Sequence, residues 1–309
     1  MSPAPPPAAG PAAESFTLPA PDGYPLGATR YRPAGPPRAH LVVAGATAVP
    51  QGFYRRFAEH AAAAGYAVLT LDYRGVGRSA PPGGPGALRG LRLDFRDWAR
   101  LDLAAAVALA QSDAARDGAP GAPRPLGIVA HSYGGHALGL LPAPEVVGAA
   151  YVFGTGAGWH GWMPPLERVR VLALWRVAGP LLTRRYGYLP WRRLGMGEDL
   201  PLDVYRQWRR WCGYPRYFFD DPEVAGEVAA SFARVRFPVA AANAVDDRWA
   251  PPRSRDAFMR AGFANAPWEA VDLNPRALGA GPVGHLGYFR PAHRRLWDDA
   301  LGWLGARLA

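Results

Sequence analysis

Residues 125–141 read PLGIVAHSYGGHALGLL, and this stretch decides the fold. Its first six residues, PLGIVA, form a short apolar run that is typical of a buried strand. The next residues, SYGGHALGLL, predict a helix that begins directly after the strand. Ser132 stands at the junction. It is therefore either a nucleophile on a tight turn or an ordinary hydroxyl at a helix N-terminus.

The small residues around Ser132 favour the first interpretation. A nucleophile elbow is a strand-to-helix turn so sharp that the positions two before and two after the nucleophile must be small. Here those positions are Ala130 and Gly134, and Gly135 follows. Glycine is usual where Ala130 stands, but one added methyl is a modest crowding. The start of the helix also directs backbone amides toward developing negative charge.

Strand-like and helix-like segments alternate along most of the chain. A hairpin around an Asp-Gly turn is expected at 16–33. Further strands are predicted at 40–46, 66–72, 146–154, 238–245 and 268–273, and helices at 53–65, 94–111, 252–262 and 293–308. This alternation predicts an α/β fold with one mostly parallel sheet covered by helices on both faces.

The alternation is interrupted between residues 155 and 234, where the chain is rich in aromatic residues and Arg and has no clear strand. We therefore expect residues 16–154 and 235–309 to form one core and residues 155–234 to form a helical lid or cap. Residues 1–15 are dominated by Pro and Ala, a composition that predicts a disordered arm.

A nucleophilic serine needs a base within reach and an acid that orients the base. In this architecture the chain order is Ser, then a carboxylate, then His. NAVDDRWAPP (243–252) places Asp246 and Asp247 just after a predicted strand. GPVGHLGYFR (281–290) places His285 in a glycine-flanked loop after the next strand.

Taken together, these motifs resemble the α/β-hydrolase superfamily, and more closely its lipase and serine-aminopeptidase-like branch. The resemblance covers roughly residues 16–308, and it includes LDYRGVGRS at 71–79 and the elbow AHSYGGH. It implies that Ser132 is the nucleophile, Asp247 the acid and His285 the base. Asp246 is the alternative acid, because a shift of one residue in the loop would exchange the two carboxylates.

The resemblance also implies an oxyanion hole and a substrate site. One oxyanion donor is expected to be the backbone amide of Tyr133. The other is expected from the loop after 40–46, where the amide of Ala46 is favoured and Thr47 is next. Thr47, Trp159 and His160 are candidates for substrate contact.

The formal charge of +10 raises the question of nucleic-acid or membrane partners. All 35 basic residues are Arg, and they form no block of five, so no nucleic-acid partner is expected. No apolar run approaches the roughly 20 residues that span a bilayer. The aromatic side chains and Arg of the insert fit a packed lid, an apolar acyl pocket or a surface that contacts anionic membrane. The tryptophans concerned are Trp159, Trp162, Trp175, Trp191, Trp208 and Trp211.

The single cysteine, Cys212, rules out an internal disulfide and indicates a cytoplasmic location. The N-terminal residues also lack the basic and apolar regions of a secretory signal. Cys212 has no second thiol beside it and is expected to be buried and inert.

The predicted function is that of a serine hydrolase. It would cleave a carboxylic ester or related acyl compound through an acyl-enzyme, with a small-molecule acyl substrate and no cofactor. The alternatives are the same triad acting on a thioester, a peptide or a carbon–carbon bond, and a non-catalytic α/β-hydrolase-like binding protein. The sequence leaves the substrate and the oligomeric state open.

Overall fold

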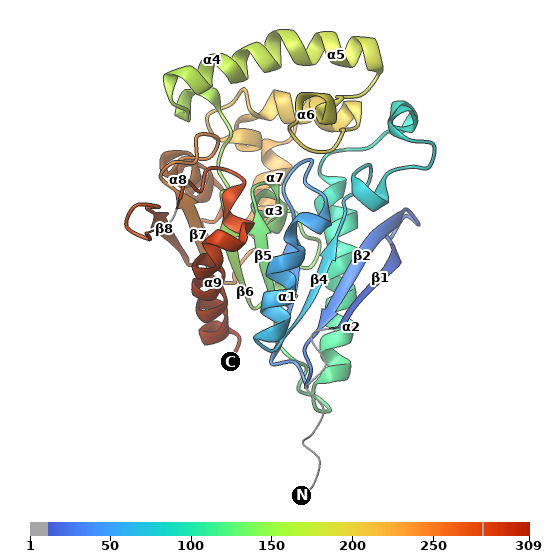
Figure 1. Cartoon of the computed structure of the whole chain (residues 1–309), viewed down its shortest axis with the longest axis vertical. Helices are drawn as coiled ribbons and strands as arrows, with labels where there is room; N and C mark the ends of the chain where they lie inside the picture. Colours follow the sequence, from blue (N-terminus) through green and yellow to red (C-terminus); the bar gives the residue numbers. More distant parts are fainter. Residues whose placement is uncertain (1–11, 280) are drawn as a thin grey trace, which may run out of the picture.

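The computed structural model describes residues 12–279 and 281–309. Within them eight strands form one sheet, in the order β1-β2-β4-β3-β5-β6-β7-β8 (Figure 1). β2 pairs antiparallel with both β1 and β4, and the other neighbours are parallel. The strands are β1 (Ala12–Pro19), β2 (Pro25–Arg32), β3 (Ala39–Ala44), β4 (Tyr66–Leu71), β5 (Leu126–His131), β6 (Ala149–Phe153), β7 (Val239–Ala244) and β8 (Trp268–Leu273).

Helices cover both faces of this sheet (Figure 1). On one face, α1 (Arg55–Ala63) and α9 (Arg294–Arg307) bury their apolar side chains in one core. On the other face, a second core includes α2 (Ala104–Asp117), α3 (Tyr133–Leu138) and α8 (Pro252–Gly262). The central strands β3 to β7 are buried at every residue, because a doubly covered sheet has no solvent face. The predicted α/β architecture is confirmed.

Strand β1 begins earlier than the sequence predicts. Residues 12–15, which we assigned to the disordered arm, pair with β2 along the edge of the sheet. The hydroxyls of Ser15 and Thr29 lie 3.0 Å apart, and Glu14 forms an ion pair of 3.1 Å with Arg30. These cross-strand contacts depend on β2 and leave no local signal in a stretch rich in Ala and Pro. The remainder of the predicted arm, residues 1–11, lies outside the described residues.

Between β6 and β7 the chain is helical, and every residue of this segment is described. Its one β pairing is the isolated bridge between Leu189 and Leu200. In Figure 1, α4 and α5 lie outermost, beyond the carboxyl ends of the parallel strands, and α6 lies beneath them. The helices are α4 (Pro165–Ala173), a π-helical turn (Leu174–Ala178), α5 (Gly179–Tyr186), α6 (Leu202–Trp211) and α7 (Ala225–Phe232).

Two findings bear on the other sequence expectations. Among the described residues, no helix is both long enough and apolar enough to cross a membrane. Cys212 follows α6 and is buried, and burial raises the pKa of its thiol. A buried, protonated thiol is a poor nucleophile, as expected for this residue.

Candidate active site

Ser132 lies on a strained turn between β5 and α3. Its φ of 51° and ψ of −109° place a residue with a side chain in a region that glycine favours. Two contacts hold the turn against β6. The Ser132 amide donates to the carbonyl oxygen of Phe153 at 2.9 Å, and the Thr155 hydroxyl donates to the carbonyl oxygen of Ser132 at 2.7 Å. Strain that the surrounding structure maintains in this way is typical of a functional residue.

The two glycines after Ser132 are required by close packing. A Cβ atom at Gly134 would overlap the backbone carbonyl of Ala44, and one at Gly135 would overlap the Thr155 side chain. Ala130, by contrast, pairs with Ala44 of β3 and Val152 of β6 inside the sheet. The methyl group that departs from the usual motif is therefore accommodated there.

Ser132, His285 and Asp247 form one hydrogen-bonded chain, although they follow three different strands. The Ser132 Oγ lies 3.0 Å from His285 Nε2, and His285 Nδ1 lies 2.9 Å from Asp247 Oδ2. A carboxylate only accepts, so Nδ1 carries the proton and Nε2 accepts from the serine hydroxyl. The sequence predicted this group of three residues, and the fold brings them together.

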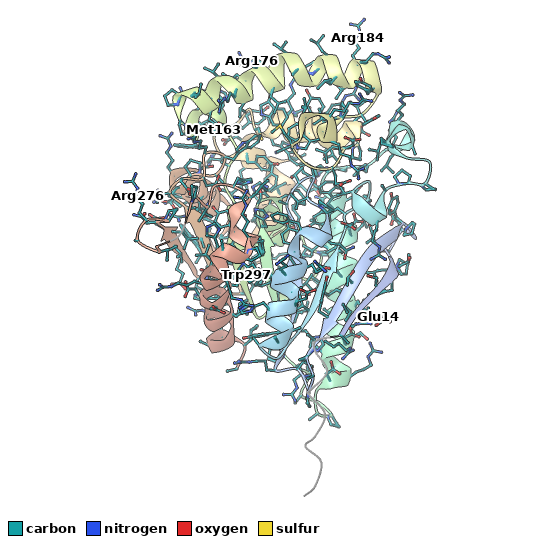
Figure 2. The ribbon with its side chains drawn as sticks, in the orientation of Figure 1. Glu14, Met163, Arg176, Arg184, Arg276 and Trp297 are labelled. Atoms are coloured by element: carbon teal, nitrogen blue, oxygen red, sulfur yellow. The ribbon has the colours of Figure 1, made fainter. Side chains whose placement is uncertain are left out.

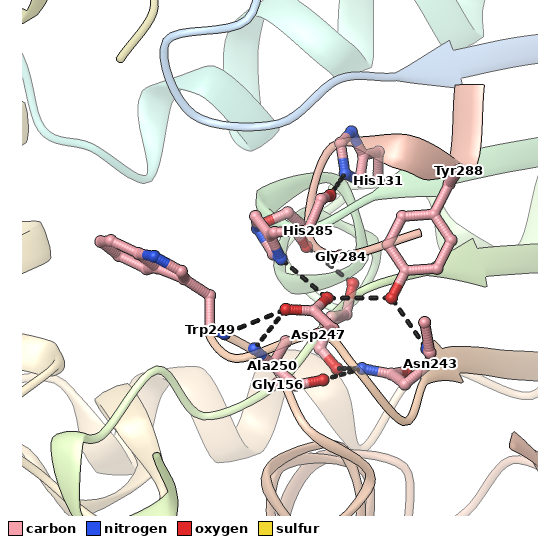
Figure 3. Close-up of polar contacts among 12 residues, drawn as sticks. His131, Gly156, Asn243, Asp247, Trp249, Ala250, Gly284, His285 and Tyr288 are labelled. Carbon is pink, nitrogen blue, oxygen red and sulfur yellow. Dashed lines mark hydrogen bonds and ion pairs between the residues drawn. The ribbon is translucent and has the colours of Figure 1, made fainter. Parts of the chain in front are cut away.

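Asp247 is fully enclosed by donors (Figure 3). Its Oδ1 accepts from the amides of Trp249 and Ala250 at 3.0 and 2.9 Å, and its Oδ2 also accepts from the Tyr288 hydroxyl at 2.9 Å. Burial acts to raise the pKa of Asp247, but the charge of His285 and these hydrogen bonds outweigh it and leave the pKa below its ordinary value. The carboxylate therefore stays ionised beside the imidazole.

Asp246, the alternative acid, has a different position. Its two carboxylate oxygens accept from the amides of Val283 and Gly284 at 3.0 and 3.1 Å. These contacts anchor the loop that carries His285, and the described hydrogen bonds of the imidazole go to Ser132 and Asp247. The geometry thus favours Asp247 over Asp246 as the partner of His285.

The Ala46 amide has a partner that the sequence analysis did not foresee. It donates to the buried Tyr54 hydroxyl at 2.8 Å, so our expectation that it points to Ser132 as an oxyanion donor does not match this structure. The Tyr54 hydroxyl lies 3.0 Å from His131 Nδ1, and His131 Nε2 lies 2.9 Å from the carbonyl oxygen of His285 (Figure 3 shows the last contact). A carbonyl only accepts, so Nε2 carries the proton and Tyr54 donates to Nδ1. This network connects the loop after β3 to the loop that carries His285.

Removing the Tyr54 hydroxyl should weaken both loops. Tyr54→Phe leaves the Ala46 amide and His131 Nδ1 without their partner, and each buried unsatisfied group costs about 1–3 kcal/mol. We expect the free energy of unfolding to fall by about 1–3 kcal/mol for each of these two groups, and we expect a lower kcat. Tyr66→Phe is the matched control, since it removes one buried hydroxyl that donates to Leu301, remote from Ser132. Equal effects of the two substitutions on kcat would contradict the network.

Two buried histidines should make stability depend on pH. Burial lowers the pKa of His131 to about 3 and that of His136 to about 4, from an ordinary value of 6.5. At a pH between the folded and the unfolded pKa of each histidine, the unfolded chain binds a proton that the folded chain does not. The free energy of unfolding therefore falls as the pH drops from 6.5 toward 4. Each histidine lowers the folding equilibrium constant about tenfold per pH unit in that window.

His136→Gln tests this dependence, because a glutamine amide can replace the donor that the His136 imidazole provides to the Gly156 carbonyl. In urea unfolding, the slope of stability against pH should become shallower by one proton. An unchanged slope would show that His136 already titrates normally in the folded protein.

Two pockets adjoin the serine–histidine pair. The first, of about 240 Å³, is lined by Ser132, Thr47 and His285 together with apolar side chains. The second, an open groove of about 680 Å³, is lined by Asp246, Pro164 and Glu167 among others. Trp249 and His285 line both. The apolar lining of the first pocket consists of Ala46, Val49, Trp191, Met196, Trp208, Trp249 and Leu286.

Trp159 and His160, expected as substrate contacts, line neither pocket. The Trp159 ring packs on Trp162 at 5.4 Å between centroids, and the His160 carbonyl accepts from Arg168 at the base of α4. Gly158, with a φ of 66°, turns the chain just before them. Both therefore support the first turn of the insert, and Thr47 alone of the three candidates borders Ser132.

Known proteins resemble this chain in sequence and in fold. Residues 35–178 match the family model described as serine aminopeptidase, S33. A soluble variant of monoglyceride lipase from Saccharomyces cerevisiae superposes with a TM-score of 0.63 and 15% identity, covering 99% of both chains. The sheet order, the elbow and these two matches together establish the fold. The protein has the α/β-hydrolase fold.

Larger peptidases share the fold of this chain. A putative dipeptidyl aminopeptidase IV from Bacteroides ovatus and a puromycin-hydrolyzing peptidase from Mycobacterium tuberculosis both give a TM-score of 0.55, with 15% and 16% identity. They match 96% and 97% of this chain, which spans only 35% and 40% of theirs. No curated protein matches this chain in sequence. The family match over residues 35–178 agrees with the expected serine hydrolase class, and the structural matches, at such low identity, show the fold alone.

Proposed function

We propose that the hydrolase cleaves carboxylic esters that carry a small apolar or aromatic acyl group, with Ser132, His285 and Asp247 as its triad. One observation carries the proposal: the Ser132 Oγ, on a strained elbow, lies 3.0 Å from an imidazole whose other nitrogen lies 2.9 Å from a buried carboxylate. This arrangement meets the geometric requirements for a nucleophile, a base and an orienting acid.

The reaction follows from the proton positions. His285 Nε2 takes the hydroxyl proton as Ser132 Oγ attacks the ester carbonyl, and Asp247 stabilises the imidazolium that forms. The imidazolium then protonates the departing alcohol and leaves an acyl group on Ser132. Water, activated by the same imidazole, attacks the acyl-enzyme and releases the acid.

The oxyanion needs two donors near Ser132. The first is the amide of Tyr133, because the first amides of α3 have no acceptor within the helix. We assign the second to Thr47 rather than Ala46, whose amide is already bonded to Tyr54. Thr47 borders the same pocket as Ser132, which supports this assignment.

The small pocket suggests the size of the acyl group. A volume of about 240 Å³ holds roughly eight groups of the size of a water molecule, at about 30 Å³ each. Its indole walls come from Trp191 and Trp208 in the segment 155–234 and from Trp249 after β7. Trp208 and Trp249 stack with 6.0 Å between centroids. We therefore propose that 155–234 acts as a lid whose inner side selects a short or aromatic acyl chain.

A panel of nitrophenyl esters of increasing acyl length tests this function. We expect kcat/KM to be highest for benzoyl or for acyl chains of up to about eight carbons and to fall for longer ones. Trp208→Ala should shift the optimum toward longer chains because it opens one wall. Trp303→Ala, a tryptophan on α9 outside the pocket, should leave the profile unchanged.

Two other outcomes would count against the proposal. Turnover confined to thioesters or amino-acid anilides would assign the same triad to another bond. A folded protein that cleaves none of these compounds and does not react with a fluorophosphonate would be a binding protein.

A further inference from the structure

Exposed large hydrophobic side chains gather at one end of the molecule. Among the described residues there are eight, and all lie in the segment 155–234 or in the loops after β7 and β8. Four of them lie on one helical stretch, where they are 57–64% exposed. A concentrated apolar patch with a polar rim is typical of an interaction surface rather than of random exposure. The eight are Leu166, Val169, Val177, Leu181, Leu194, Met196, Val245 and Leu286.

The helical stretch 165–186 has two opposite faces. Its inner line is buried and recurs every four residues, at Val171, Trp175, Gly179 and Thr183. The outer line runs two residues out of phase, at Val169, Ala173, Val177 and Leu181, and all four are exposed. Two residues correspond to about 200° of helix rotation, so the outer line faces directly away from the protein.

The π-helical turn keeps these lines straight. Successive four-residue steps drift around an ordinary α-helix, which has 3.6 residues per turn. The π turn at Leu174–Ala178 holds more residues per turn and offsets this drift. The stretch therefore presents one continuous apolar ridge, which we call the outer helix face and define by Leu166, Val169, Ala173, Val177 and Leu181.

Positive charge flanks the outer helix face. Residues 165–186 contain five Arg and one Glu, a net charge of +4. Arg170 lies 3.7 Å from that Glu, Glu167. In Figure 2, Arg176 and Arg184 extend outward from the helix, away from the body of the protein. An apolar ridge bordered by Arg is the pattern of a helix that lies in the interface of an anionic membrane.

We propose that the outer helix face docks on the surface of an anionic lipid bilayer. The apolar ridge would enter the boundary between headgroups and acyl chains, and Arg176, Arg184 and Arg185 would contact the phosphates. The phosphates of a nucleic acid could pair with the Arg side chains, but a nucleic acid would leave the exposed Leu and Val side chains without apolar contacts. The core of an ordinary protein interface is depleted in charged residues. The combination of ridge and charge favours lipid.

Docking in this orientation places the candidate active site at the membrane. Pro164 and Glu167, at the start of α4, line the open groove that reaches His285. Val245, which is exposed, lines the same groove. A bound bilayer would therefore lie at the mouth of the groove. The docking does not depend on the proposed reaction and can be tested without it.

The test is co-sedimentation of the full chain with phosphatidylcholine vesicles that contain or lack phosphatidylglycerol. We expect binding to the anionic vesicles, weakened by salt but not abolished, and little binding to the neutral ones. The combined variant Arg176→Ser, Arg184→Ser, Arg185→Ser should lower the affinity on the order of a hundredfold. The combined variant Leu166→Ser, Val177→Ser, Leu181→Ser should also release the protein, because it removes the apolar ridge.

A charge-matched control separates docking from net charge. Arg116→Ser, Arg260→Ser, Arg307→Ser removes three Arg at the C-terminal ends of α2, α8 and α9, near the opposite edge of the sheet, and should leave vesicle binding intact. All variants should keep the wild-type melting temperature and hydrolyse water-soluble esters at the wild-type rate. Failure of the wild type to bind anionic vesicles would overturn the proposal. So would self-association through this face without vesicle binding, tight binding to DNA in place of vesicles, or equal losses in the control variant.

Discussion

Replacing Ser132 with alanine is expected to lower kcat for ester hydrolysis by about a million-fold and to abolish labelling by a fluorophosphonate. The substitution removes only the hydroxyl group, and its loss leaves His285 with no proton to take. Effects of this size are general for a serine nucleophile that acts as a unit with its base. Stopped-flow or steady-state assays with a nitrophenyl ester measure the rate of hydrolysis, and mass spectrometry identifies the residue that carries the fluorophosphonate label.

Ser112→Ala is the control for this experiment. Ser112 is an exposed residue of α2 outside both pockets, so its loss should change neither rate nor labelling. Full labelling of the Ser132→Ala protein would place the nucleophile elsewhere and remove the basis of the proposed reaction. An unchanged melting temperature in both variants would establish that the comparison concerns chemistry and not folding.

Asp247→Asn should reduce kcat about ten-thousandfold, the second largest effect that we expect. The asparagine amide group can donate to His285 Nδ1. The imidazole then carries its proton on Nε2, and Nε2 can no longer accept from the Ser132 hydroxyl. The same substitution removes a charge that stabilises the imidazolium. The loss should therefore fall on kcat and leave KM almost unchanged.

Asp246→Asn is an unusually close comparison, because the two carboxylates are neighbours in the chain. It should cost only about tenfold in kcat, since Asp246 holds the His285 loop through the amides of Val283 and Gly284 and an asparagine retains one acceptor oxygen. Steady-state kinetics of the two variants on one ester decide between them. A larger loss for Asp246→Asn would reverse their proposed roles.

Much of the core could be predicted because its signals are local. The helix at 252–262 and the strand at 268–273 match α8 and β8 residue for residue. In both, the pattern of apolar residues and the flanking Pro or Gly mark the ends. The grouping of Ser132, Asp247 and His285 was also predictable, because each follows a different predicted strand and parallel strands end at one edge of the sheet.

The parts that could not be predicted depend on contacts between distant residues. The Ala46 amide is occupied because the Tyr54 side chain folds back onto it, and no local pattern reveals that. Tyr288 lies within the quoted GHLGYFR motif, but its bond to Asp247 requires the loops after β7 and β8 to meet. Similarly, Trp208 and Trp249 line one pocket only because the fold brings α6, which carries Trp208, to the loop after β7. Their separation in the sequence gives no sign of this contact.

The buried Cys212 has a practical consequence. Because the only thiol of the chain is buried and protonated, maleimide dyes should not label the native protein. In a Leu181→Cys variant, the new cysteine would then be the only site that the dye labels. An environment-sensitive dye at that position would report, in real time and without separating bound from free protein, whether the helix has entered hydrocarbon.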